Sequence, residues 1–325
     1  MAENAPEIRP DADVPETATM VINAVGRQRQ SMGSVARDYL ALTKPKIISL
    51  LLVTAAGGMF LAEQGLPSLV MLAWVWIGGS LASGGANAIN QHLDRDIDRE
   101  MRRTRARPVA GHRVSPRYAL AFGVGLNVLA FALLATLVNP LAAILTLCAS
   151  LFYVFVYTIW LKRTTPSNIV IGGAAGAVPP MVGWVAVTGS LDLPAVYLFA
   201  IIFFWTPPHF WALSLLIQGD YEQAGVPMLP VVSSRGQTTL HIFLYSIALT
   251  GLTLMFALLP EVGLIYLASA AVLGAPFIWL AWRLWREDSR GRAKATYLYS
   301  LAYLALLFVA VMVDSVIDTS FGITI

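Results

Sequence analysis

Long apolar stretches alternate with short polar segments along almost the whole chain. Nine of these stretches are long enough to cross the hydrocarbon core of a membrane, which takes about 20 residues in a helix. They lie near residues 46–63, 68–92, 117–137, 139–160, 167–188, 193–217, 238–259, 262–282 and 296–317. The pattern predicts an all-α fold, a polytopic membrane protein with about nine transmembrane helices.

The composition supports a lipid environment. Of the 325 residues, 57% are hydrophobic and 13% are charged, which lies outside the range of soluble globular domains. Residues 1–38 differ, because they are rich in Pro, Ala and acidic residues, and they are predicted to form a disordered tail before a transmembrane domain at 39–325. Acids such as Glu3 and Asp11 are unusual in a mitochondrial transit peptide, and the tail lacks the apolar core of a secretory signal.

The basic residues predict the orientation. All 22 Lys and Arg residues fall in the tail, at the start of the first span, or in the loops after spans two, four, six and eight. Because basic loops stay on the cytoplasmic side, the N-terminus is predicted to be cytoplasmic and the C-terminus periplasmic. The acid-containing tail favours a bacterial inner membrane over a mitochondrial one.

The loop after the second span carries an unusual density of charge. If the helix continues past the membrane, Asn90, Asp94 and Asp98 share one face, since they are four residues apart. Three oxygen-bearing side chains on one face suit Mg²⁺, which binds carboxylates together with substrate phosphates. The alternative is an internal network of Asp–Arg salt bridges. Arginines that could hold phosphate follow at positions 102, 103, 105 and 107.

A second acidic loop follows span six. It contains Asp220, and the even number of spans between Asp94 and Asp220 places both on the same side of the membrane. Lys162 and Arg163, in the loop between them, are further candidates for phosphate binding. A cavity that is apolar inside and has acidic and basic groups at its rim would suit a prenyl diphosphate.

Three segments of the chain carry a family resemblance. They are the run from Tyr39 to Lys46 with Lys44-Pro45-Lys46, the Asp94-Arg-Asp-Ile-Asp98 run with the following Met-x-Arg-Thr-x-x-Arg-Pro, and Asp220-Tyr221 with Pro227-Met-Leu-Pro230. Together they resemble the UbiA superfamily of intramembrane prenyltransferases, and within it the members that modify heme. The resemblance covers roughly residues 35–317. Gln91 stands where many members have Asp, and Ala224 replaces the second acid of the later motif.

The resemblance implies a helical bundle around a central cavity, with farnesyl diphosphate as donor, heme B as acceptor and heme O as product. It also implies Mg²⁺, held by Asn90, Asp94, Asp98 and Asp220, with the three aspartates as the catalytic residues. The diphosphate would be bound by Asn90 and by basic residues drawn from Arg102, Arg103, Arg105, Arg107, Lys162 and Arg163. The lipid bilayer is the surrounding partner, heme A synthase or oxidase assembly factors are candidate protein partners, and nucleic acid is not expected.

Two histidines are candidates for binding heme. His209 follows Pro207-Pro208 in an apolar span, where it is either a heme ligand or a hydrogen-bonded core residue. His92 lies beside the carboxylate motif, so it either contacts heme or hydrogen-bonds a metal-binding aspartate.

Two other functions are compatible with the sequence. A related prenyltransferase would act on a quinone precursor or a chlorophyll-type ring, with the same diphosphate site. A transporter or heme-handling protein would place its charged groups near the middle of the membrane, whereas here they gather at one rim.

Overall fold

The structure is a computed structural model, and it describes residues 32–317. Within that part of the chain, nine helical segments are long and apolar enough to cross a membrane. They are α3 (Pro45–Glu63), α4 (Leu69–Leu93), α6 (Pro116–Leu137), Pro140–Thr164, α9 (Asn168–Thr188), α10 (Leu193–Leu216), α13 (Arg235–Phe256), α14 (Leu264–Glu287) and α15 (Arg290–Ile317). The predicted all-α membrane fold is confirmed, with span boundaries that differ by a few residues.

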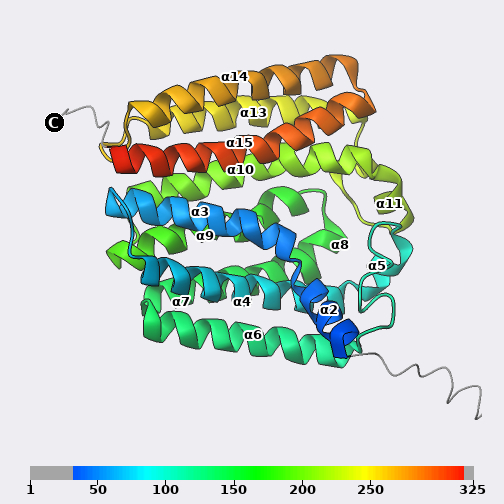
Figure 1. Cartoon of the computed structure of the whole chain (residues 1–325). Helices are drawn as coiled ribbons and strands as arrows, with labels where there is room; N and C mark the ends of the chain where they lie inside the picture. Colours follow the sequence, from blue (N-terminus) through cyan, green and yellow to red (C-terminus); the bar gives the residue numbers. More distant parts are fainter. Residues whose placement is uncertain (1–31, 318–325) are drawn as a thin grey trace, which may run out of the picture.

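The long helices lie side by side in one bundle, from α14 along one edge to α6 along the other (Figure 1). The main apolar core is formed between α3, α9, α10 and α15, and it includes Met59, Leu198 and Phe308. Helix α10 is the most deeply enclosed of the nine, with 67% of its apolar window buried inside the protein. Most of α10 is therefore packed against other helices.

Helices α3 and α9 approach each other closely at glycines. A Cβ atom on Gly183 would lie 1.9 Å from the carbonyl oxygen of Ala55, and one on Gly58 would lie 2.1 Å from that of Pro180. No larger residue fits such a contact, which is how small residues bring membrane helices together. The glycines fix the spacing of two helices in the centre of the bundle.

A short helix precedes the first span. Helix α2 (Met32–Thr43) has polar and apolar faces, and its residues Asp38 and Leu42 are buried. The Arg113 guanidinium pairs with Asp38 at 2.9 Å, and the Gln91 amide donates to the carbonyl of Leu42 at 3.1 Å. The boundary predicted at residue 38 therefore falls inside a helix, while residues 1–31 of the predicted tail lie outside the described residues.

The fourth span is not α-helical throughout. It begins as α7 (Pro140–Leu151), continues as a ten-residue π-helix (Phe152–Leu161), and ends in α8 (Lys162–Thr164). A π-helix of this length is uncommon, and π turns often occur at functional sites. No feature of the sequence analysis predicted it.

The short helices of the polar loops gather at one end of the bundle. Figure 1 shows α5 (Arg95–Glu100), α8 and α11 (Gln218–Gln223) at the same end as α2, and α12 (Leu229–Val232) follows α11 along the chain. The loops after spans two, four and six thus share one face of the bundle, as predicted from the span count.

Candidate active site

Three polar residues of the first acidic motif are buried at the junction of α4 and α5. Helix α4 ends at Leu93, but the helical hydrogen bonds continue from Asp94 N to Asn90 O and from Asp98 N to Asp94 O, both 2.8 Å. The side chains therefore stay four residues apart on one helical path. Asn90, Asp94 and Asp98 are 3%, 0% and 1% exposed, so each carboxylate needs a partner.

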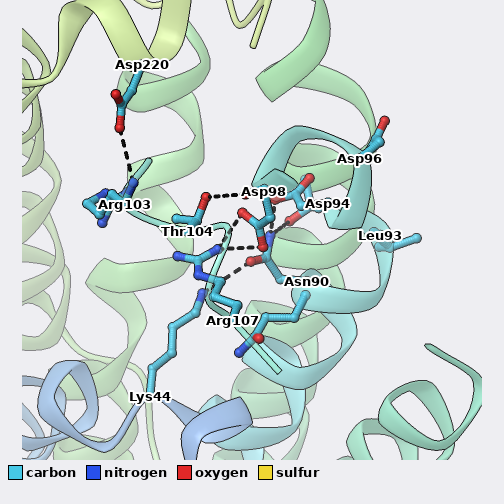
Figure 2. Close-up of polar contacts among 12 residues, drawn as sticks. Lys44, Asn90, Leu93, Asp94, Asp96, Asp98, Arg103, Thr104, Arg107 and Asp220 are labelled. Atoms are coloured by element: carbon cyan, nitrogen blue, oxygen red, sulfur yellow. Dashed lines mark hydrogen bonds and ion pairs between the residues drawn. The ribbon is translucent and has the colours of Figure 1, made fainter. Parts of the chain in front are cut away.

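Cationic side chains supply those partners. The Lys162 ammonium lies 2.5 Å from Asp94 Oδ2, and the Arg107 guanidinium donates to both oxygens of Asp98 at 2.7 and 2.9 Å. The predicted alternative of an internal salt-bridge network is thus present in this structure (Figure 2). The network also holds Arg107 and Lys162 beside the carboxylates, where they could bind phosphate.

Asp96 belongs to a different, more exposed pair. Its carboxylate accepts two hydrogen bonds from Arg163, at 2.7 and 2.8 Å. The Arg163 guanidinium holds the pKa of the Asp96 carboxyl well below its usual range. Arg163 also lies 3.6 Å from Asp94 Oδ1, which links the exposed pair to the buried cluster. Asp96 faces an open hollow of about 500 Å³ between α5 and the residues after α11.

Lys44 enters the site from the start of the first span. Its ammonium donates to Asn90 Oδ1 at 3.2 Å. Burial, together with the nearby positive charges of Arg107 and Lys162, lowers the pKa of Lys44 well below its usual value. A cation held among other cations favours a negatively charged ligand. The sequence analysis used Lys44 for the family resemblance but did not place it in the site, and the only signal was its position just before an apolar span.

Asp220 lies apart from the other two aspartates. Its Oδ2 accepts a hydrogen bond from the backbone N–H of Arg103 at 3.3 Å, so the loop after α5 links the two acidic motifs (Figure 2). Tyr221, beside it, is buried, and burial raises the pKa of its hydroxyl. The side chains of Arg102, Arg103 and Arg105 are exposed, whereas Arg107 points into the cluster.

The donor atoms fit a magnesium ion only in part. Among residues 32–317, no group of three or more His, Cys, Asp or Glu residues is close enough to hold a metal by itself. The available donors are oxygens, as Mg²⁺ requires, and the buried Oδ1 of Asp94 has no hydrogen-bond partner within that range. The site therefore suits a metal that takes its remaining ligands from a bound diphosphate and water.

His209 lies between α10 and α15, with its ring 7% exposed. It stacks on Trp205 at a centroid distance of 4.3 Å, and its Nδ1 lies 2.7 Å from Ser300 Oγ. Because the Ser300 hydroxyl donates to the carbonyl of Tyr297, it can only accept from His209. Nδ1 thus carries the proton and Nε2 carries the lone pair, with no hydrogen-bond partner in the described chain.

His92 lies at the same end of the bundle but faces another neighbour. Its Nδ1 is 2.8 Å from the carbonyl oxygen of Pro116, at the start of α6. The predicted hydrogen bond to a metal-binding aspartate is not among the contacts that it makes here. His92 is close to the first acidic motif in sequence, but its ring is directed toward α6.

Comparisons with known proteins agree on one family. Residues 51–310 match the UbiA prenyltransferase family. A protoheme IX farnesyltransferase of Roseiflexus sp. is 51% identical over 87% of this chain and 53% of its own length, and one of Synechocystis sp. is 48% identical over 90% and 93%. The chain spans about half the length of several curated relatives that it matches. A solved UbiA homolog from Archaeoglobus fulgidus bound to GPP and Mg²⁺ superposes with a TM-score of 0.61 at 17% identity, over 85% of this chain and 99% of that one.

Proposed function

Because the chain belongs to the UbiA prenyltransferase family, we propose that it transfers a farnesyl group from farnesyl diphosphate to heme B and forms heme O. The observation that carries the proposal is the buried cluster at the end of α4, where Asp94 and Asp98 lie beside Lys44, Arg107 and Lys162. Acidic and basic groups at one rim of a membrane bundle suit a diphosphate attached to a long apolar chain. The choice of heme as acceptor rests on relatives named protoheme IX farnesyltransferase.

The basic residues have a defined part in the reaction. When the carbon–oxygen bond of an allylic diphosphate breaks, the bonding electrons leave with the diphosphate, and cations already in place stabilise that charge. Arg107 and Lys162 pair directly with the buried carboxylates, and Lys44 donates to Asn90 beside them. Arg163 and the exposed Arg102, Arg103 and Arg105 form an outer set that would attract the diphosphate from the cytoplasmic side.

A magnesium ion would be held by Asp94 and Asp98, with Asn90 assisting and Asp220 contributing from the second loop. When bound, the ion would neutralise charge on the departing diphosphate. Binding would also give Asp94 and Asp98 a new cationic partner, which frees Lys162 and Arg107 to contact phosphate. Relatives with Mg²⁺ in their solved structures support the choice of ion.

The acceptor half of the reaction would use the apolar interior. A heme vinyl carbon would attack the farnesyl cation, and water would add to the neighbouring carbon and lose a proton. His209 is the better-supported heme ligand because its Nε2 lone pair is free, and His92 would contact the porphyrin edge. Tyr153 and Tyr157, stacked at 5.4 Å, would shield the cation from stray water.

The proposed setting is the bacterial inner membrane, with the N-terminus in the cytoplasm and the C-terminus in the periplasm. The loops after spans two, four, six and eight carry basic residues, and the short helices α5, α8 and α11 lie together at one end of the bundle. Partnership with heme A synthase or oxidase assembly factors stays a prediction.

The test is a reconstituted assay. Purified protein in detergent is incubated with heme B, farnesyl diphosphate and Mg²⁺, and heme O is sought by chromatography and mass spectrometry, with Asp94→Asn as the control. Heme O from the parent protein and none from the variant would support both reaction and site. Transfer of farnesyl to a quinone precursor instead would replace the acceptor, and no transfer by folded protein would favour the transport function.

A further inference from the structure

We propose that Thr158, on the π-helix, is a positioning residue that fixes the orientation of the Asn90 amide and thereby presents oxygen atoms to the metal and diphosphate. The inference rests on the proposed diphosphate site. Thr158 is 0% exposed and comes from the fourth span, 68 residues from Asn90. Neither the acidic motifs nor the basic pool includes it.

The hydrogen bonds of Thr158 leave it only one role toward Asn90. Its hydroxyl donates to the carbonyl of Tyr153 at 2.9 Å, five residues earlier, which is the spacing of a π-helix. A hydroxyl has one hydrogen, so Oγ1 can only accept from the Asn90 amide at 3.2 Å. The NH₂ group of Asn90 must therefore face Thr158.

A second, independent contact gives the same orientation. The Lys44 ammonium has donors and no acceptor, and it lies 3.2 Å from Asn90 Oδ1. The oxygen of the amide is thus directed at the cationic side of the cluster, where a diphosphate would bind. If the amide were flipped, an oxygen would face Thr158 Oγ1 and an NH₂ group would face an ammonium, and both contacts would be lost.

The fixed amide also determines how Asp94 is presented. Asn90 Nδ2 donates to Asp94 Oδ2 at 2.7 Å, and the Lys162 ammonium donates to the same oxygen. Both donors converge on Oδ2, so Oδ1 accepts no hydrogen bond from the described residues, and the Arg163 guanidinium lies 3.6 Å from it. The orientation therefore leaves two oxygens for a ligand, Asn90 Oδ1 and Asp94 Oδ1.

One segment of the fourth span reaches both residues because Thr158 and Lys162 are four positions apart and share a helix face. Thr158 contacts Asn90 and Lys162 contacts Asp94, so two pairs of residues four apart face each other across the two spans. Lys162 immediately follows the last residue of the π-helix, Leu161. Both side chains thus face the end of α4.

The experiment measures metal binding rather than turnover. Mn²⁺ replaces Mg²⁺ because its free form is visible by electron paramagnetic resonance, and inorganic diphosphate is present at a fixed concentration. Thr158→Val keeps the shape and removes the hydroxyl, and Mn²⁺ affinity is expected to fall roughly tenfold, the effect of one lost hydrogen bond in a charged network. Thr158→Ser retains the hydroxyl, and its Mn²⁺ affinity should be within about twofold of that of the parent.

Asn90→Leu and Thr164→Val complete the design. Asn90→Leu has the branched shape of asparagine and removes both the amide oxygen and the NH₂ group without adding charge, so its Mn²⁺ affinity should fall at least as far as that of Thr158→Val. Thr164→Val is the matched control, because the Thr164 hydroxyl bonds only the carbonyl of Trp160 in its own segment. Its affinity should equal that of the parent.

Either of two results would overturn the proposal. One is parent-like Mn²⁺ affinity in Thr158→Val. The other is parent-like Mn²⁺ affinity in Asn90→Leu, which overturns the proposal even if the Thr158→Val variant fails to fold. Heme O formation is assayed separately on the same preparations. If the parent protein makes heme O but the variants do not show the predicted Mn²⁺ affinities, only the role of Thr158 is wrong. If the variants show the predicted affinities but the parent protein makes no heme O, the proposed acceptor chemistry is wrong.

Discussion

The ammonium nitrogen of Lys162 lies 2.5 Å from Oδ2 of Asp94, and both side chains are buried. The two residues are 68 positions apart and come from the ends of different spans, so the pair joins the π-helix to α4. A buried ion pair is costly to form but still more costly to break on one side. The same contact thus stabilises the bundle and holds a cation beside the candidate metal ligand.

Removing only one partner of this pair should destabilise the protein. Lys162→Met leaves the buried Asp94 carboxylate with only the Arg163 guanidinium, 3.6 Å from its Oδ1, as a cationic partner, and we expect a loss of about 3–5 kcal/mol. The double variant Asp94→Asn with Lys162→Met should recover part of that loss, because no buried charge then lacks a partner. Thermal unfolding in detergent measures both. A double variant no more stable than Lys162→Met would contradict this expectation.

The bidentate contact between Arg107 and Asp98 should require arginine. Arg107→Lys keeps the charge but can form only one of the two hydrogen bonds, and hydrogen bonds to charged groups contribute about 1.5–3 kcal/mol. We expect kcat/KM for farnesyl diphosphate to fall about 10- to 100-fold. Arg99→Lys, at an exposed position in α5, is the matched control and should change activity little. Similar losses in both variants would show that the bidentate contact with Asp98 is not what the activity depends on.

Heme coordination by His209 predicts a spectroscopic change. The Soret band of ferric heme B should shift when the parent protein is added, and the His209→Ala variant should not cause this shift. Ser300→Ala removes the group that holds the proton on Nδ1, and loss of such an outer contact typically weakens metal binding about 10- to 100-fold. His241→Ala is the control, because His241 is exposed and bonds a backbone carbonyl of its own helix. An unchanged Soret shift in His209→Ala would exclude this residue as the iron ligand.

The close approach of α3 and α9 should tolerate no side chain at Gly183. Gly183→Ala places a methyl group on the carbonyl oxygen of Ala55, so the helices must separate, at a cost of about 1–3 kcal/mol or more. Gly176, two helical turns before Gly183 in α9, has open space around the position of an added Cβ atom. Gly176→Ala should therefore be neutral or stabilising by up to about 1 kcal/mol. Thermal unfolding of the two variants compares them directly. A Gly183→Ala variant as stable as the parent would contradict the packing.

Mg²⁺ removal should separate binding from structure. Excess EDTA is expected to abolish farnesyl transfer, and added Mg²⁺ or Mn²⁺ should restore it. The melting temperature should change little, because Asp94 and Asp98 already have cationic partners without a metal. A large drop in melting temperature with EDTA would instead indicate a structural metal.

The sequence by itself determined the membrane fold and the side on which the chemistry lies. Apolar runs of about 20 residues can only be helices in a bilayer, since every backbone polar group must be bonded within its own segment. The distribution of Lys and Arg then placed the loops, and the spacing of Asn90, Asp94 and Asp98 predicted one shared face. Each of these features depends on residues that are close together in the chain, so it can be inferred from the sequence alone.

Only the tertiary structure decided which side chains meet. Lys44, Thr158 and Ser300 come from three different spans, and nothing in their own segments marks them as partners of Asn90 or His209. The π-helix likewise depends on packing, because Phe152–Leu161 reads as an ordinary apolar helix in sequence. Contacts between distant segments are set by helix packing and by the need to satisfy every buried polar group, and neither has a periodic signature along the chain.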